Sequence, residues 1–188
     1  YHSSAEPSGV AGFAEVVASH DAAPMLGYVA RGDTTVADAY LSPVLLRYVR
    51  GFQRELAARF GDVPLLLMQS NGGLVDVAGL RGVNGVLSGP AGGVVGMVAA
   101  GAADAPVRLA GFDMGGTSTD VSLYTGELPR RFAAEIDGVR LQAPMMDIHT
   151  IAAGGGSIVR FADAGITVGS APAGADPGPA CYRRGGPA

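Results

Sequence analysis

The sequence contains no lysine and no tryptophan, and its 13 basic residues are all arginine. A P-loop needs a lysine on the nucleotide phosphates, and Schiff-base catalysis needs a lysine amine, so both mechanisms are excluded. The simplest explanation for the missing residue types is a GC-rich genome, and we expect a bacterial source.

Cysteine and charge are also scarce. A single cysteine, Cys181, excludes an internal disulfide framework and a cysteine zinc cluster, and it favours a reducing cytoplasm. No histidine or acidic pattern surrounds Cys181, so we expect an inert thiol rather than a nucleophile. The net charge of -4, without a basic stripe, argues against nucleic acid as a partner. The apolar run at residues 94–103 is too short to span a membrane.

Hydrophobic residues, by contrast, make up 48% of the chain, and there are 30 glycines. This composition predicts a packed domain with many tight turns. The chain begins at YHSSAEPSG without a methionine, and we interpret residues 1–188 as an internal piece of a longer protein. Residues 1–32 form a leading segment with weak signals, among them a short helix at residues 13–18.

Several helices are expected. Asp33 is a plausible N-cap for a helix that Pro43 divides in two. A small-residue helix is predicted at residues 89–105. One face of the first helix carries apolar residues at three- and four-residue spacing: Leu45, Tyr48, Val49, Phe52, Leu56 and Phe60.

The remaining pattern predicts strands. Residues 63–70 and 107–114 read as buried strands, and residues 83–90 contain another short strand. Strands at hairpin spacing follow, with turns at Gly126, Gly138 and residues 154–156, before a loop-like tail. The sequence therefore predicts an α/β fold, a mixed sheet with flanking helices.

The stretch DMGGTSTD, residues 113–120, carries the clearest chemistry. Two glycines after a strand allow a sharp turn whose N–H groups can face an anion, and Thr117, Ser118 and Thr119 add hydroxyl donors. Asp113 would repel a bare phosphate, so its presence favours a divalent cation between the two. Asp120 would orient the loop or polarise a water. The alternative is a plain hairpin turn with aspartate caps.

Asp147 and His149 are two residues apart in MMDIHTI, so a strand would place them on one face. They could share a divalent metal or act as an acid–base pair, and a structural hydrogen bond is the alternative. Ser70 and Asn71 follow a strand, where ligands often bind in α/β sheets, and are candidates of lower rank. The methionines at 68, 114, 145 and 146 are expected in the core.

Six stretches in order resemble the hydantoinase A / 5-oxoprolinase family, whose members include ATP-dependent ring-opening amidohydrolases and ketone carboxylase subunits. These stretches are TTVADAYLSP, LLLMQSNGG, LSGPAGGVVG, FDMGGTSTDVSLY, DIHTIAAGGGSI and AGADPGPACY, which cover residues 33–186 broadly. Ala152, and the segment at residues 170–179, depart from the usual family pattern.

The resemblance implies a subdomain similar to the actin, Hsp70 and sugar-kinase ATPases, a ribonuclease H-like fold. FDMGGTSTD then resembles the second phosphate hairpin of such a fold, and LSGPAGGVVG resembles the small-residue hinge helix. Because the chain carries one such loop, we expect it to hold half of an ATP cleft and to be inactive alone.

The resemblance also implies an activity, cofactors and partners. ATP with Mg²⁺ would phosphorylate a small cyclic amide or imide, of the hydantoin or 5-oxoproline type, that water then opens. A hydantoinase B-type subunit or domain is a further expectation from the resemblance, and a second divalent metal is an expectation from Asp147 and His149. The candidate catalytic residues are Asp113 and Asp120. The candidate metal ligands are Asp113 and, from their spacing alone, Asp147 and His149. The candidate cofactor-binding residues are Gly115, Gly116, Thr117, Ser118, Gly154, Gly155, Gly156 and Ser157.

Two alternative functions stay open. The same motifs would serve a carboxylase subunit that phosphorylates a ketone enol or bicarbonate. A nucleotide-binding assembly module without turnover belongs to another class, and the acidic pair in DMGGTSTD argues against it.

Overall fold

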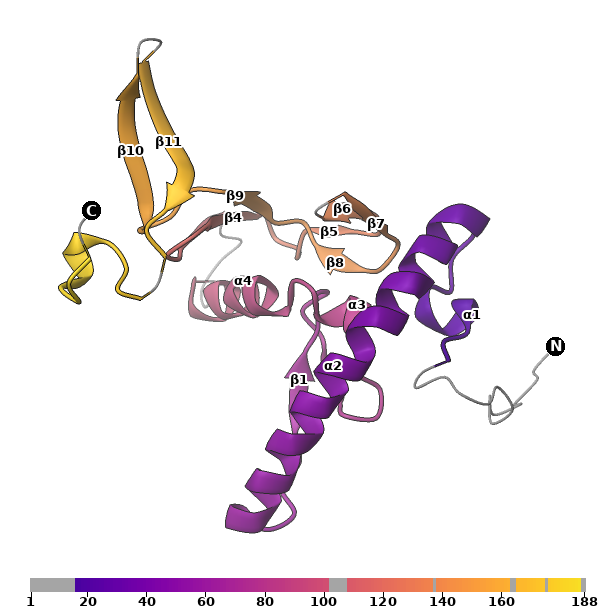
Figure 1. The fold of residues 1–188 in the computed structure, drawn as a ribbon. Coiled ribbons are helices and arrows are strands. Elements are labelled where there is room, and N and C mark those ends of the chain that lie inside the picture. The colour runs from indigo at the N-terminus through magenta and orange to yellow at the C-terminus, as the bar shows by residue number, and fades with distance from the viewer. Residues whose placement is uncertain (1–15, 102–107, 137, 163–164, 175, 187–188) are drawn as a thin grey trace. The chain divides into compact units, whose positions relative to one another are not determined.

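The computed structural model describes residues 16–101, 108–136, 138–162, 165–174 and 176–186, and Figure 1 shows it as a ribbon. The chain contains both helices and strands, as predicted, but every strand pair among the described residues is antiparallel, so the predicted mixed sheet is not present there. It divides into two compact units, and each unit is built from two segments. The first unit comprises residues 1–91 and 130–146, and the second comprises residues 92–129 and 147–188. Within the part described, no helix is long and apolar enough to cross a membrane.

The first unit begins with the four-residue helix α1 (Ser19–Ala22) and the long helix α2 (Tyr28–Phe60), drawn in indigo and purple in Figure 1. The prediction of a helix start at Asp33 is wrong, because α2 begins after Gly27, whose φ of 116° is accessible to glycine. Asp33 lies inside the helix instead, where its carboxylate pairs with Arg140 at 2.8 Å. The expected helix at residues 13–18 lies partly outside the described residues, and residues 16–18 are not helical.

The predicted break at Pro43 is also wrong, because α2 runs through this residue without interruption. A proline inside a helix loses one backbone hydrogen bond. Contacts made by the turn just before Pro43, described next, hold the backbone helical on that side. The predicted apolar face is only partly buried: Val49 is 3% exposed, whereas Tyr48 and Phe60 are 74% and 69% exposed.

A buried polar network joins α2 to the segment that follows β2. The Asp38 carboxylate is fully buried and accepts hydrogen bonds from the Ser42 hydroxyl at 2.9 Å and the Val83 N–H at 3.2 Å. It also pairs with the Arg81 guanidinium at 3.2 Å. The Gly82 N–H donates to the Ser42 hydroxyl at 2.8 Å, which completes the network.

This network explains why the predicted strand at residues 83–90 is absent. The segment forms the short helix α3 (Gly82–Gly85), followed by the start of α4 (Ser88–Gly101). A Cβ at Gly82 would lie only 2.6 Å from the backbone nitrogen of Ser42, so the segment packs directly on α2. Its first N–H groups are bound by side chains of α2 rather than by a neighbouring strand. The small-residue helix predicted from residue 89 is confirmed as α4.

The core of the first unit lies between these helices and four short strands. β5 (Arg130–Arg131) pairs with β8 (Met145–Met146), and β6 (Ala134–Ile136) pairs with β7 (Val139–Leu141) across the predicted turn at Gly138. Met145 and Met146 are fully buried, as expected for core methionines. The core cluster comprises Val83, Leu141, Ala143 and Met145, with Ala37, Val86, Leu87, Ala134 and Ile136 packed against it.

The predicted strand at residues 63–70 is shorter and more exposed than expected. β1 (Leu66–Met68) pairs only with β2 (Leu74–Asp76) among the described residues, and Leu66 is 56% exposed. Ser70, which follows β1, is fully buried. Its hydroxyl donates to the Asn84 carbonyl at 2.8 Å and accepts from the Leu87 N–H at 2.9 Å, so it serves packing rather than a ligand.

The second unit contains a three-stranded antiparallel sheet in the order β3 (Leu109–Met114), β4 (Thr119–Tyr124) and β9 (His149–Ile151). The strand predicted at residues 107–114 is confirmed from residue 109. It is not buried, however, because Phe112 and Met114 are 71% and 55% exposed. A Cβ at Gly111 would meet the Ser122 hydroxyl of β4 and lie 3.0 Å from the Met97 sulfur of α4, so a larger residue there would have to displace both side chains.

The chain then forms the hairpin of β10 (Ser157–Ala162) and β11 (Gly165–Pro172). A loop-like tail follows, as predicted, and contains the single-turn 3₁₀ helix η1 (Ala180–Tyr182). Cys181 is exposed in this helix.

Candidate phosphate-binding site

The site predicted at DMGGTSTD forms at the tip of the β3–β4 hairpin. The strands pair up to Met114 and Thr119, and the four residues between them make the turn. The Gly115 N–H donates to the Ser118 carbonyl at 2.9 Å, which closes the turn. The tight turn expected from the two glycines is therefore present directly after the strand.

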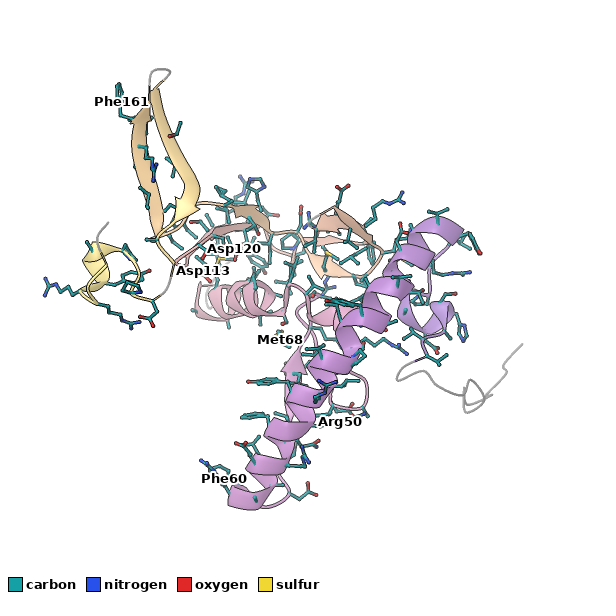
Figure 2. All side chains as sticks on the ribbon, in the orientation of Figure 1. Arg50, Phe60, Met68, Asp113, Asp120 and Phe161 are labelled. Carbon is teal, nitrogen blue, oxygen red and sulfur yellow. The ribbon has the colours of Figure 1, made fainter. Side chains whose placement is uncertain are left out.

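Asp113 and Asp120 are directly opposite each other on neighbouring strands. Thr150 of β9 is opposite Asp120 on its other side, so the three side chains share one face of the sheet. The Thr150 hydroxyl donates to the Asp120 carboxylate at 2.6 Å, and Figure 2 labels both aspartates at this end of the hairpin. Two carboxylates placed side by side repel each other, and a cation bound between them would relieve that repulsion.

The second glycine turn, at residues 154–156, packs against the first turn through its backbone. The Gly155 N–H donates to the Gly115 carbonyl at 2.9 Å, and the Gly156 N–H donates to the Gly116 carbonyl at 2.7 Å. A Cβ at Gly154 would lie 2.6 Å from the Gly115 carbonyl oxygen. A Cβ at Gly156 would likewise lie 2.9 Å from the Gly116 carbonyl oxygen, so the close approach of the two backbones explains the glycines at positions 154 and 156.

Further hydrogen bonds hold the second turn in place. The Gly154 N–H donates to the Ser157 hydroxyl at 2.9 Å, and the Ser157 N–H donates back to the Gly154 carbonyl at 2.9 Å. The buried Thr119 hydroxyl donates to the Ala153 carbonyl at 2.6 Å. The N–H groups of residues 154–157 are therefore all used within the protein, and they support the first turn.

Unpaired donors remain in the first turn. The N–H groups of Gly116, Thr117 and Ser118 have no acceptor among the described residues, and neither do the hydroxyls of Thr117 and Ser118. Gly116 and Thr117 are exposed, and Ser118 is half-buried. Three consecutive free N–H groups beside a carboxylate pair suit a phosphate with a divalent cation. The residues present therefore fit Mg²⁺ and a nucleotide phosphate.

Asp147 and His149 lie apart from this face. The expectation that one strand carries both residues is wrong, because Asp147 lies between β8 and β9 and only His149 belongs to the sheet. His149 is opposite Val121, which in turn is opposite Phe112, so its row alternates with the row of Asp113. Because successive side chains point to opposite faces, His149 and Asp113 do not share a face. No group of three or more metal-ligating side chains gathers among the residues that the structure describes. A metal at Asp147 and His149 would thus be a separate site.

Sequence reasoning overlooked Thr150, which contacts Asp120 from the neighbouring strand. The sequence did place Thr150 directly after His149, in a segment that was expected to be a strand. Only the register of β9 against β4 could connect this residue to the aspartates.

A family model described as hydantoinase/oxoprolinase matches residues 31–188. The 5-oxoprolinase of Dictyostelium discoideum is 43% identical to this chain, in an alignment that covers 93% of the chain and 15% of that protein.

Two solved structures are similar as well. The ATP-dependent caprolactamase of Pseudomonas jessenii has a TM-score of 0.69 and 36% identity, covering 89% of this chain and 25% of that one. A nucleotide-free structure of acetone carboxylase, described for ATP-dependent acetone carboxylation, has a TM-score of 0.69 and 26% identity, covering 83% and 22%. The chain therefore spans about a seventh to a quarter of the length of these relatives.

Proposed function

We propose that this chain, which belongs to the hydantoinase/oxoprolinase family, carries half of the nucleotide site of an ATP-dependent enzyme that opens small cyclic amides or imides. Family membership confirms the resemblance seen in the six sequence motifs. The activity belongs to a longer enzyme, because the chain spans only 15% of the 5-oxoprolinase and 25% of the caprolactamase. Both relatives are named after rings that contain an amide.

One observation carries the proposal: two glycine turns are bound to each other, and the first presents three free N–H groups beside two carboxylates. In the proposed arrangement the N–H groups of residues 116–118 bind phosphate oxygens. Asp113 and Asp120 bind Mg²⁺, directly or through water. Thr150 holds Asp120 in position. The first turn is supported by Gly154, Gly155, Gly156 and Ser157. The cofactor-binding role expected for these four residues is therefore indirect in this arrangement.

The fold proposed for the whole nucleotide site is that of the actin, Hsp70 and sugar-kinase ATPases. The β3–β4 hairpin, with its glycine turn and flanking aspartates, is consistent with the phosphate hairpin of such proteins. α4 would be the hinge helix, and the boundary between the two units falls within it, between Ala91 and Gly92. A second phosphate hairpin would come from another part of the enzyme.

When bound, ATP would supply a phosphoryl group to the oxygen of the ring amide. That oxygen would then be part of a good leaving group. This chain contributes by positioning the phosphoryl group and by neutralising its charge. Free N–H groups in a fixed turn stabilise negative charge without having to reorganise. The carboxylate pair holds the cation that offsets the phosphate charge.

Binding of Mg²⁺·ADP to the full chain tests this proposal. In two-dimensional ¹H–¹⁵N NMR, we expect the backbone signals of Gly116, Thr117 and Ser118 to shift on titration, even if the affinity is only millimolar. Asp113→Asn should weaken binding about tenfold or more, because a charged ligand of the cation is lost. Asp62→Asn, which removes an exposed carboxylate from the first unit, is the matched control.

The magnesium dependence sharpens the test. Without magnesium, Asp113→Asn should bind ADP no worse than the wild-type chain, because the substitution removes a repulsive charge. Absence of any shift at residues 116–118 in the wild-type chain would contradict the proposal.

A ketone carboxylase is the second candidate, and the similarity to acetone carboxylase favours it. Phosphate release by the longer enzyme separates the two. A hydrolase requires a cyclic amide or imide, and a carboxylase requires a ketone together with bicarbonate. Binding of ATP by that enzyme without any turnover would instead favour a nucleotide-binding assembly module.

Partners and location complete the proposal. A hydantoinase B-type subunit or domain is the proposed partner, since one relative is named as the alpha subunit of a caprolactamase. A cytoplasmic location remains a prediction from the single cysteine, and a bacterial source one from the composition.

A further inference from the structure

Tyr182 ends η1 and lies beside the junction of the two glycine turns. A Cβ at Gly155 would be 3.4 Å from the Tyr182 hydroxyl oxygen, and a Cβ at Gly116 would be 3.5 Å from it. The hydroxyl is therefore close to both turns at once, one of which carries the unpaired N–H groups.

The Tyr182 hydroxyl has no hydrogen-bond partner among the described residues, and the side chain is 41% exposed. Arg183 and Arg184 follow directly, are exposed, and form no ion pair within the part of the chain described. Arg183 has a φ of 57°, in the left-handed region that non-glycine residues rarely adopt. A hydroxyl and two cations, none with a partner among the residues described, thus lie within three consecutive residues.

We propose that the Tyr182 hydroxyl donates a hydrogen bond to a phosphoryl oxygen held by residues 116–118, which makes Tyr182 a ligand-binding residue of this site. The inference rests on the proposed function and deepens it. A phenolic O–H is a good donor, and its bonds to charged phosphoryl oxygens are stronger than those to neutral acceptors. The hydroxyl would add a fourth donor to the three N–H groups of the turn.

The experiment measures binding of two probes, Mg²⁺·ADP and Mg²⁺·pyrophosphate, to the full chain by NMR titration. Tyr182→Phe keeps the ring and removes only the hydroxyl, so we expect both dissociation constants to rise about tenfold. The midpoint of thermal unfolding should not change. The matched control is Tyr124→Phe, which removes a hydroxyl that donates to the Gly126 carbonyl at 3.0 Å.

A second readout follows Tyr182 directly. With ¹³C at the hydroxyl-bearing ring carbon of tyrosine, the Tyr182 signal, identified by its absence in Tyr182→Phe, should shift with both probes. The Tyr124 signal should not.

Each other outcome overturns the inference. If Tyr182→Phe binds both probes like the wild-type chain while Asp113→Asn binds them weakly, the inference fails and the proposed function stands. If only ADP binding weakens, the hydroxyl contacts the nucleoside rather than a phosphoryl group. If the wild-type chain binds neither probe, the proposed function fails and the inference fails with it.

Discussion

Asp113, Asp120 and Thr150 form a row across three strands, beside the first glycine turn. The aspartates supply two negative charges on one face of the sheet, and Thr150 fixes the orientation of one of them. A hydroxyl that donates to a carboxylate restricts its rotamers and leaves its other oxygen free for a cation. Thr150 is therefore a positioning residue in the proposed site.

Thr150→Val tests this role, because it keeps the side-chain shape and removes the donor to Asp120. We expect Mg²⁺·ADP binding to weaken about two- to tenfold, the value of one net hydrogen bond. Thr150→Ser should restore binding. Thr167→Val, which removes the hydroxyl that donates to the Arg160 carbonyl on the β10–β11 hairpin, is the control. Unchanged binding in Thr150→Val would show that Asp120 needs no orientation.

At this scale the sequence predicted the aspartates and the glycine turn, because their spacing alone requires a turn between two strands. It could not predict Thr150, since cross-strand neighbours depend on the register. The ligand role suggested for Ser70 failed because nothing in the sequence shows that Asn84 and Leu87 occupy its hydroxyl.

At the scale of the elements, the contact between the two glycine turns leaves the least room for side chains. Their hydrogen bonds run between backbone groups, and Gly154 has no room for a side chain. The first glycine turn, at residues 115–118, is thus held in shape by a segment far along the sequence.

Gly154→Ala should separate the two turns. The added Cβ would lie 2.6 Å from the Gly115 carbonyl oxygen, so we expect a loss of about 1–3 kcal/mol of stability and weaker Mg²⁺·ADP binding. In Gly155→Ala, the nearest atom to the new Cβ is the Tyr182 hydroxyl at 3.4 Å, so this variant is the matched control for stability, which should change little. Thermal unfolding and the NMR titration measure both effects. Equal behaviour of the two variants would contradict a tight backbone joint.

Elements with strong local signals were predicted best: the β3–β4 hairpin from its turn, and α4 from its small residues. The start of α2 and the identity of α3 were missed, because tertiary contacts decide both. α2 extends N-terminal of Asp33, and the Gly82 and Val83 N–H groups find side-chain acceptors on α2. A short apolar run such as residues 83–90 carries no periodicity that separates strand from helix.

At the scale of the whole molecule, the chain forms two units whose segments alternate along the sequence. Six motifs in order were enough to predict the family, because they cover both units. The boundaries of the two units could not be predicted. No linker-like composition marks the points near residues 91, 129 and 146 where the chain passes from one unit to the other. The likeness to actin-type ATPases stays a proposal.

Asp38→Ala tests how far the two units are stabilised separately. The substitution leaves the Arg81 charge and the Val83 N–H without their buried partner, so we expect a loss of about 2–4 kcal/mol. Amide hydrogen exchange should become faster at Gly82 and Val83, and less so at Gly155 and Gly156 of the second unit. Asp33→Ala, which removes a half-exposed pair with Arg140, should cost under about 1 kcal/mol. Equal acceleration in both units would show that they unfold as one.

The path of the chain between the two glycine turns has a consequence for folding. It leaves the second unit after Pro129, contributes strands to the first unit, and returns at Asp147. The Thr119–Ala153 hydrogen bond therefore closes a loop of 34 residues, which forms more slowly than the local hairpin. During synthesis the first glycine turn would emerge before the second turn that supports it. We expect nucleotide affinity to arise only after residues 147–157 have left the ribosome, so binding would report that the segments of the first unit are complete and that the two glycine turns have met.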